Sequence, residues 1–185
     1  TLGPRINAAG RVAHASAAVE LLIAETESEA LELAGALNLN NDTRRQFDLD
    51  ITEEALSMIH NNEVLRSAKS TVLFKNTWHK GVIGIVAARC IEKYYRPTVI
   101  LTESNDKITG SARSVMGFDL YEAICKCSDL LEKFGGHKYA AGLTMEKKNL
   151  EAFQQRFEEV VTAQITSEML TPSIEIDTTI SFDAI

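Results

Sequence analysis

Apolar residues in the first third of the chain recur at helical spacing. From Ser28 to about His60 they fall at intervals of three or four residues, and the stretch contains no Pro. This pattern predicts one helix of unusual length, or two helices in series broken near Asn38 to Asn41. A helix of that length is typical of a strut between bodies rather than of one compact core. Residues 1–15 lack clear periodicity and predict a loop that leads into a helix near Ser16.

After residue 65 the pattern changes to alternating strands and helices. Strands are predicted over residues 70–75, 98–102, 107–114 and 139–145, and helices over residues 81–95, 120–134 and 149–165. The pair Gly135 and Gly136 predicts a turn before the last strand. This order predicts an α/β domain with a compact mixed sheet.

The same patterns divide the chain into three parts. Residues 1–64 form an interdomain loop and a long connector helix, and residues 65–166 form the α/β domain. Residues 167–185 include Ile174, Ile176, Thr178 and Ile180, which alternate like a strand. We expect this last part to begin a further domain that is truncated here, just as the start of the chain reads as cut from something longer.

Composition narrows the class of protein. The 185 residues carry 19 Lys and Arg against 26 Asp and Glu, for a formal net charge of -7. This excludes a protein that coats nucleic acid by bulk charge. The longest apolar run is far below the roughly 20 residues of a membrane helix, and no signal-peptide stretch opens the chain, so we expect no membrane association and a cytoplasmic protein. Three cysteines, an odd number without Cys-x-x-Cys spacing, predict reduced, buried thiols.

Charge is distributed in blocks along the chain. Residues 1–19 carry only Arg5 and Arg11, whereas residues 20–63 carry eleven acidic residues against two arginines, a net of -9. Residues 64–96 are basic again, with seven Lys and Arg against Glu92. Such blocks allow a local basic cleft on an acidic protein, and a purely solubilising role is the alternative.

Three polar junctions could bind a phosphate. Trp78, His79 and Lys80 precede Gly81 where a predicted helix begins, and a helix N-terminus favours anions. The alternative is an ordinary strand-to-helix loop with a packed Trp. In the second junction, Gly110 to Ser114, small residues flank Arg113, which can hold a phosphate in a bidentate fork. A strand with surface Ser and Arg is the alternative there.

The third junction is Gly135-Gly136-His137, followed by Ala140-Ala141-Gly142. Two glycines before a His predict a tight turn that exposes an imidazole and bare amides. The small residues behind it leave room for the backbone of a ligand. A solvated turn His is the alternative.

Four motifs in order carry a family resemblance: GPRINAAGR from Gly3, WHKGVIGIVAAR from Trp78, GSARS from Gly110 and GGHKYAAG from Gly135. Together they resemble the RecJ exonucleases of the DHH phosphoesterase superfamily, over about residues 1–166. The resemblance implies a connector helix and a DHH-associated domain that binds substrate phosphates, followed by the start of an OB-fold. It implies these substrate-binding residues: Arg5, Asn7, Arg11, Trp78, His79, Lys80, Gly110, Ser111, Arg113, Ser114, Gly135, Gly136 and His137.

The resemblance also implies a function for the parent protein. It would be a metal-dependent exonuclease that degrades single-stranded DNA from the 5′ end in DNA repair and recombination, with a helicase and a single-strand binding protein as partners. Its two divalent metals, Mn²⁺ or Mg²⁺, would be held by Asp and His ligands of a DHH domain. This sequence contains no Asp-His-His and no cluster with metal-ligand spacing. We therefore expect no metal ligand and no catalytic residue here, His137 having a supporting role, and we expect this chain alone to be inactive.

Two other readings stay open. One is a DHH-superfamily phosphodiesterase that acts on short oligonucleotides or cyclic dinucleotides, since those enzymes share a Gly-Gly-His motif. The other is a nucleotide-binding module without catalysis. An Asp-rich segment ending in Asp-His-His upstream of Thr1 in the parent reading frame would favour the exonuclease.

Overall fold

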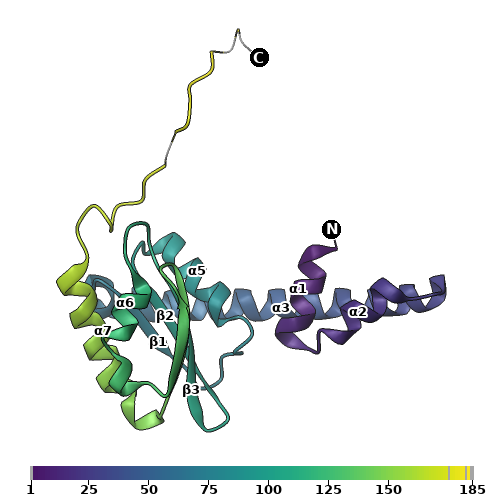
Figure 1. The fold of residues 1–185 in the computed structure, drawn as a ribbon, viewed down its shortest axis with the longest axis horizontal. Helices are drawn as coiled ribbons and strands as arrows, with labels where there is room; N and C mark the ends of the chain where they lie inside the picture. Colours follow the sequence, from purple (N-terminus) through teal and green to yellow (C-terminus); the bar gives the residue numbers. More distant parts are fainter. Residues whose placement is uncertain (1, 175, 182, 184–185) are drawn as a thin grey trace.

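One long helix dominates the molecule. The computed structural model describes residues 2–174, 176–181 and 183. Helix α3 (Glu27–His60) has 34 residues and runs along the longest axis of the molecule (Figure 1). At its start, the Thr26 side chain accepts a hydrogen bond from the Glu29 backbone N–H at 3.3 Å, the usual N-cap arrangement. The predicted long helix is confirmed, and it is not broken near Asn38 to Asn41.

Two short helices pack against the N-terminal half of α3. Helix α1 (Gly3–Val12) crosses α3 on the side toward the sheet domain, and helix α2 (Ser16–Ile23) extends toward the far end of α3 (Figure 1). Ala9, Ala18 and Leu37 form the small core between the three helices. The predicted loop over residues 1–15 is therefore wrong. An Ala- and Gly-rich segment has little amphipathic signal of its own, and its helix is stabilised by packing on α3.

The second body is built on a five-stranded sheet. In spatial order the strands are β1 (Thr71–Phe74), β2 (Thr98–Ser104), β3 (Lys107–Arg113), β5 (Ala140–Met145) and β4 (Lys133–His137). Strands β1 and β2 are parallel, and the other neighbouring pairs are antiparallel. The predicted mixed-sheet α/β fold is confirmed.

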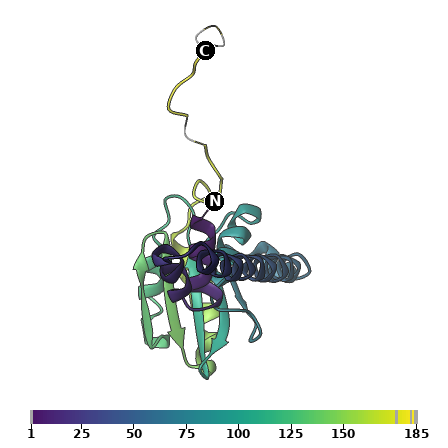
Figure 2. The ribbon, with the colours of Figure 1, turned by 90° about the vertical axis from the view of Figure 1, so that its right-hand side faces the viewer.

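Helices cover the two faces of this sheet unequally. The face that carries Leu73 and Ile100 packs on α5 (Ile83–Lys93) and on the C-terminal half of α3. The face that carries Val99 and Leu101 packs on α6 (Leu120–Cys125) and α7 (Leu150–Gln164) (Figures 1 and 2). Over β5 and β4 the first face is left open, and Gly135, Gly142 and His137 are exposed there.

The segment between α6 and β5 differs from the expectation. The predicted helix over residues 120–134 ends at Cys125, and after a 3-10 turn the chain enters strand β4. Gly135 and Gly136 therefore lie in a strand, and the turn is formed by Lys138 and Tyr139. Pairing with β5 imposes the strand on this Gly-rich segment, whose own β-propensity is low.

Helix α4 (Glu63–Ser67), which follows α3, is fixed to the sheet by a buried arginine. Arg96 donates hydrogen bonds to the carbonyl of Leu65 in α4 at 2.6 Å and to Thr71 Oγ1 at 2.8 Å. Only 5% of Arg96 is exposed, and burial lowers its pKa. Since a buried guanidinium must have its donors satisfied, this contact sets the position of α4 against the sheet.

The last residues run away from both bodies (Figure 1). Residues 172–174 and 176–181 form no strand, and Ile174 is 90% exposed; Glu175, within the predicted alternating run, lies outside the described residues. The OB-fold that the resemblance implies after the α/β domain stays a prediction. In the described part of the chain, no helix has the length and apolarity needed to cross a membrane.

Candidate nucleic-acid interface

Ser111 and Arg113 of β3 lie on the open face of the sheet, at the edge of α5. The Arg113 guanidinium donates to Ser111 Oγ at 3.1 Å and to the Ala112 carbonyl at 2.8 Å. Directly opposed residues on paired strands share a face. Arg113 is opposite Ala140, which is in turn opposite His137. Arg113 and His137 therefore share the open face, two strands and about 10 Å apart.

A second arginine reaches the same place from helix α1. Arg11 Nη1 donates to the Gly81 carbonyl at 3.0 Å, and a Cβ at Gly81 would overlap the Arg11 carbonyl oxygen. The end of α1 is thus packed directly on the loop before α5. The pKa of Arg113 is lowered, mainly by burial and then by the positive charge of Arg11. The two guanidinium groups therefore lie near enough for their positive charges to repel.

Among the described residues, no acid neutralises either guanidinium. In the part of the chain that the structure describes, Arg11 and Arg113 form no ion pair with a carboxylate. A second glycine permits the close approach of α5 to β3, because a Cβ at Gly84 of α5 would lie 2.8 Å from Ser111 Oγ and 2.9 Å from Arg113 Nη2. Two unneutralised guanidinium groups beside a hydroxyl are well suited to bind a phosphate.

Beside these arginines, the open face of β5 and β4 forms a floor. Two of its glycines are not required by the packing of their neighbours. A Cβ at Gly135 would meet nothing within 4 Å, and one at Gly142 would meet only the Gly110 carbonyl at 3.8 Å. By contrast, Gly136 has φ 151° and no room for a Cβ. The absent side chains leave a hollow of about 380 Å³, lined by Thr109, Gly110, Lys133, Phe134, Gly135, Gly142, Leu143 and Thr144.

His137 lies at the outer edge of this floor, in strand β4. The Tyr139 backbone N–H donates to His137 Nδ1 at 3.3 Å. This contact assigns the proton of the neutral imidazole to Nε2, the nitrogen that is left for a ligand. The residue is exposed, so it contributes little to the core.

The first predicted junction is arranged differently from the other two. Trp78 is buried, and its indole N–H donates to Glu54 Oε2 of α3 at 2.7 Å. His79 stacks on Phe47 of α3 with ring centroids 4.9 Å apart, and its Nδ1 accepts the Gly81 N–H at 3.1 Å. Lys80 is exposed. Trp78 and His79 thus join the loop to α3, while the loop itself contacts Arg11 through Gly81.

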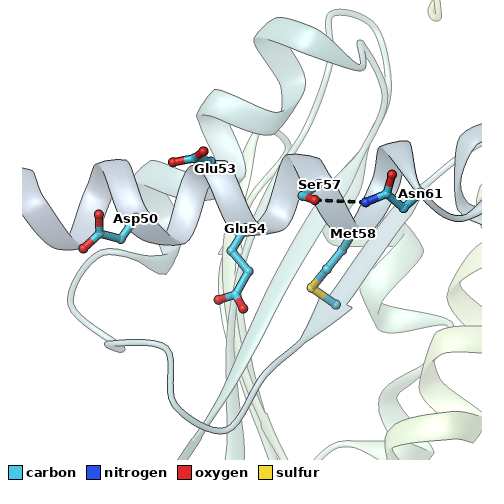
Figure 3. Close-up of a pocket in the computed structure, with 6 residues that line it drawn as sticks. All are labelled: Asp50, Glu53, Glu54, Ser57, Met58 and Asn61. Carbon is cyan, nitrogen blue, oxygen red and sulfur yellow. Dashed lines mark hydrogen bonds between the residues drawn. The ribbon is translucent and has the colours of Figure 1, made fainter.

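A larger hollow on α3 has the wrong charge for a phosphate. It measures about 550 Å³ and is lined by Asp50, Glu53, Glu54, Ser57, Met58 and Asn61 (Figure 3). Hydrogen bonds from Lys75 and Trp78 lower the pKa of Glu54, so this carboxylate stays charged. Three carboxylates repel an anion, so this hollow does not suit a phosphate.

The remaining predicted residues have local partners. Arg5 donates to Asn38 Oδ1 of α3, and Ser114 Oγ donates to the Phe118 carbonyl at 3.0 Å. Gly110 is buried under Leu101 and Leu143, with no room for a Cβ. Asn7 is exposed on α1.

The structure brings Arg11, Ser111 and Arg113 together and places Gly135 and His137 on the same open face. Sequence reasoning named Gly81 only as the residue where a helix begins and gave Gly84 no role, although a side chain at either would prevent the close approach of the elements that carry the arginines. It did indicate Gly142, because the Ala140-Ala141-Gly142 run was expected to leave room for the backbone of a ligand. The signal for Gly142 was its position in the Ala-Ala-Gly run behind the Gly-Gly-His motif.

The described side chains do not fit the divalent metal that the resemblance implies. Within the described residues, no group of three or more His, Cys, Asp or Glu side chains could hold a metal ion. No step at this site is therefore assigned to a metal held by the described residues.

Comparisons with known proteins agree with this fold. The model of the DHHA1 domain matches residues 65–163. The single-stranded-DNA-specific exonuclease RecJ of Bacillus subtilis is 37% identical over 178 residues, and that of Escherichia coli is 36% identical over 186 residues. Each match covers 95% of this chain, but only 22% and 32% of those proteins.

Solved structures give the same result. The crystal structure of RecJ from Thermus thermophilus in complex with Mg²⁺ matches with a TM-score of 0.77 and 34% identity, over 86% of this chain and 24% of that one. A structure of exonuclease RecJ bound to manganese matches with a TM-score of 0.77 and 33% identity, over 88% of this chain and 40% of that one. The resemblance to RecJ exonucleases is confirmed, and the chain belongs to the DHHA1 domain family.

Proposed function

We propose that this chain is the substrate-binding portion of a single-stranded-DNA-specific exonuclease. The observation that carries the proposal is the convergence of Arg11 and Arg113 without a carboxylate partner. Two like charges held together are unfavourable until an anion neutralises both. A DNA phosphate supplies that anion and accepts a bidentate hydrogen bond from each guanidinium.

The open face then accommodates the rest of the strand. Ser111 Oγ donates to the same phosphate, and the bare backbone at Gly135 and Gly142 lets a sugar or base lie directly on the sheet. His137 Nε2 reaches a phosphate at the far side of the floor. These contacts are to phosphate and backbone, so binding depends little on base sequence.

The activity of the parent protein is carried over from the relatives. The proposal includes hydrolysis from the 5′ end and a role in DNA repair and recombination. It also includes action in the cytoplasm, with a helicase and a single-strand binding protein as partners. Mn²⁺ or Mg²⁺ would be held by residues outside this chain and would activate the attacking water when bound. Residues of this chain hold and orient the strand.

Binding and cleavage can be tested together on a labelled thymidine 20-mer. The chain should retain single-stranded DNA at low salt and bind the matched duplex more weakly. It should release no nucleotide with Mn²⁺ or Mg²⁺, because its described residues hold no metal cluster. Gel shift and product analysis measure both. Cleavage that a chelator abolishes, or equal affinity for duplex, would contradict the proposal.

A further inference from the structure

A separate hollow lies between helices α1, α3 and α5. Its volume is about 240 Å³, and its lining residues are Pro4, Asn7, Ala8, Arg11, Arg44 and Ile85. Arg11 is therefore shared with the phosphate site described above. Asn7 and Arg11 are exposed at this hollow, so a ligand can enter it from solvent.

Arg44 is held in place by contacts along α3. Its Nη2 donates to Asn41 Oδ1 at 3.0 Å, and its Nη1 lies 3.6 Å from Asp48 Oδ2. Asp48 is only 5% exposed and is also faced by Arg89 of α5, at 3.8 Å. A guanidinium whose position is fixed by its neighbours loses little entropy when it binds a ligand.

The surroundings of the hollow remain positive although α3 is mostly acidic. Four guanidinium groups gather along α1, α3, α5 and β3: Arg11, Arg44, Arg89 and Arg113. Their carboxylate partners within the described residues are Asp48 and Glu92. Only Arg11 and Arg44 of these line the hollow itself, and within the described residues Asp48 is the one carboxylate that forms an ion pair with either of them, so the lining keeps an excess of positive charge.

We propose that this hollow binds a second phosphate of the strand whose first phosphate lies between Arg11 and Arg113. The inference rests on the proposed function and extends it to Arg44 and Asn7. Arg44 and the Asn7 amide donate to the second phosphate, and Pro4, Ala8 and Ile85 give the sugar an apolar surface. The preferred ligand is then an oligonucleotide with at least two adjacent phosphates.

The test uses two ligands that differ in one charge. They are 5′-phosphorylated dithymidylate and its analogue with a neutral methylphosphonate linkage. The wild-type chain should bind the charged ligand about tenfold more tightly, the effect of one charge-assisted contact. In Arg44→Ala this preference should disappear.

Arg89→Ala is the matched control. Each variant removes one of the two arginines beside the buried Asp48, but only Arg44 lines the hollow. Arg89→Ala should therefore keep the preference for the charged linkage. Equal preferences in the two variants would overturn the second site. A wild-type chain that binds both ligands equally would also overturn it and leave the first phosphate site standing, whereas binding of neither ligand would overturn the proposed function itself.

Discussion

The surroundings of Arg113 disfavour its positive charge, which in the proposed function a DNA phosphate would neutralise. Arg113 lies half-buried beside Arg11, and both burial and the neighbouring charge disfavour its charged form. The Ser-Ala-Arg motif identified this residue from the sequence. Nothing in the sequence near Trp78 showed that Glu54, 24 residues earlier on α3, accepts the hydrogen bond of its indole. A short motif predicts which residue types are available, and partners from distant elements decide how they are used.

His137 gives a prediction at the scale of one residue. His137→Ala should weaken binding of single-stranded DNA about three- to tenfold, since it removes one donor to phosphate. The melting temperature should stay unchanged, because the imidazole is exposed. Fluorescence anisotropy and thermal melting, measured side by side, separate the two effects.

His60→Ala is the control for losing an exposed imidazole, since His60 lies at the end of α3. It should leave DNA binding unchanged. If the two variants bind alike, His137 has no part in the site.

The different burial of the three thiols predicts that they differ in reactivity. Burial raises the pKa of Cys90 to about 12 and that of Cys127 to about 11, so both remain protonated at pH 8 and react slowly. Cys125 is only half-buried. A thiol reagent at pH 8 should modify one residue quickly, and Cys125→Ser should abolish that fast phase. Three equally fast thiols in the folded chain would contradict this burial.

At the scale of elements, the spacing of apolar residues predicted the long helix better than it predicted the elements that depend on packing against others. The long helix followed from regular spacing of apolar residues, and it is one continuous element. Helix α1 was missed because its buried face is made of alanines, whose spacing gives little amphipathic contrast. Strand β4 was missed because its strand geometry depends on pairing with β5. Both misses concern elements stabilised by tertiary contacts.

The contact between α1 and the loop before α5 can be tested by adding one methyl group at Gly81. Gly81→Ala should displace α1, because the new Cβ would overlap the Arg11 carbonyl oxygen. Arg11 would then move away from Arg113, so DNA affinity should fall about tenfold. Hydrogen exchange should accelerate in α1 and stay unchanged in the sheet.

Gly35→Ala provides the control for this change. A Cβ at Gly35 of α3 would meet nothing within 4 Å, so this variant should gain about 0.5–1 kcal/mol of helix stability and keep DNA binding. Unchanged exchange in α1 of Gly81→Ala would show that α1 does not depend on this close approach.

At the scale of the whole molecule, an acidic protein has a local positive surface, formed by Arg11 and Arg113 at the place where α1 meets the sheet domain. Helix α3 joins the α1–α2 end to the sheet domain (Figures 1 and 2). Arg11 at the end of α1 contacts the loop before α5, and its charge acts on Arg113. The mixed sheet was predictable from the alternation of elements. The convergence of two arginines 102 positions apart was not, since it depends on glycine spacers whose neighbours only the fold reveals.

The salt dependence of DNA binding tests the central claim most directly. The affinity for a labelled thymidine oligomer should fall steeply between about 50 and 200 mM salt, because each phosphate contact releases counterions. Arg113→Ala should weaken binding and lower the slope of log affinity against log salt by about 0.7, the value for one contact with a single strand. Arg156→Ala, which removes an exposed arginine on α7 across the sheet, should match the wild type. Binding that ignores salt, or an Arg113→Ala variant with the wild-type slope, would contradict the assignment of Arg113 to a DNA phosphate.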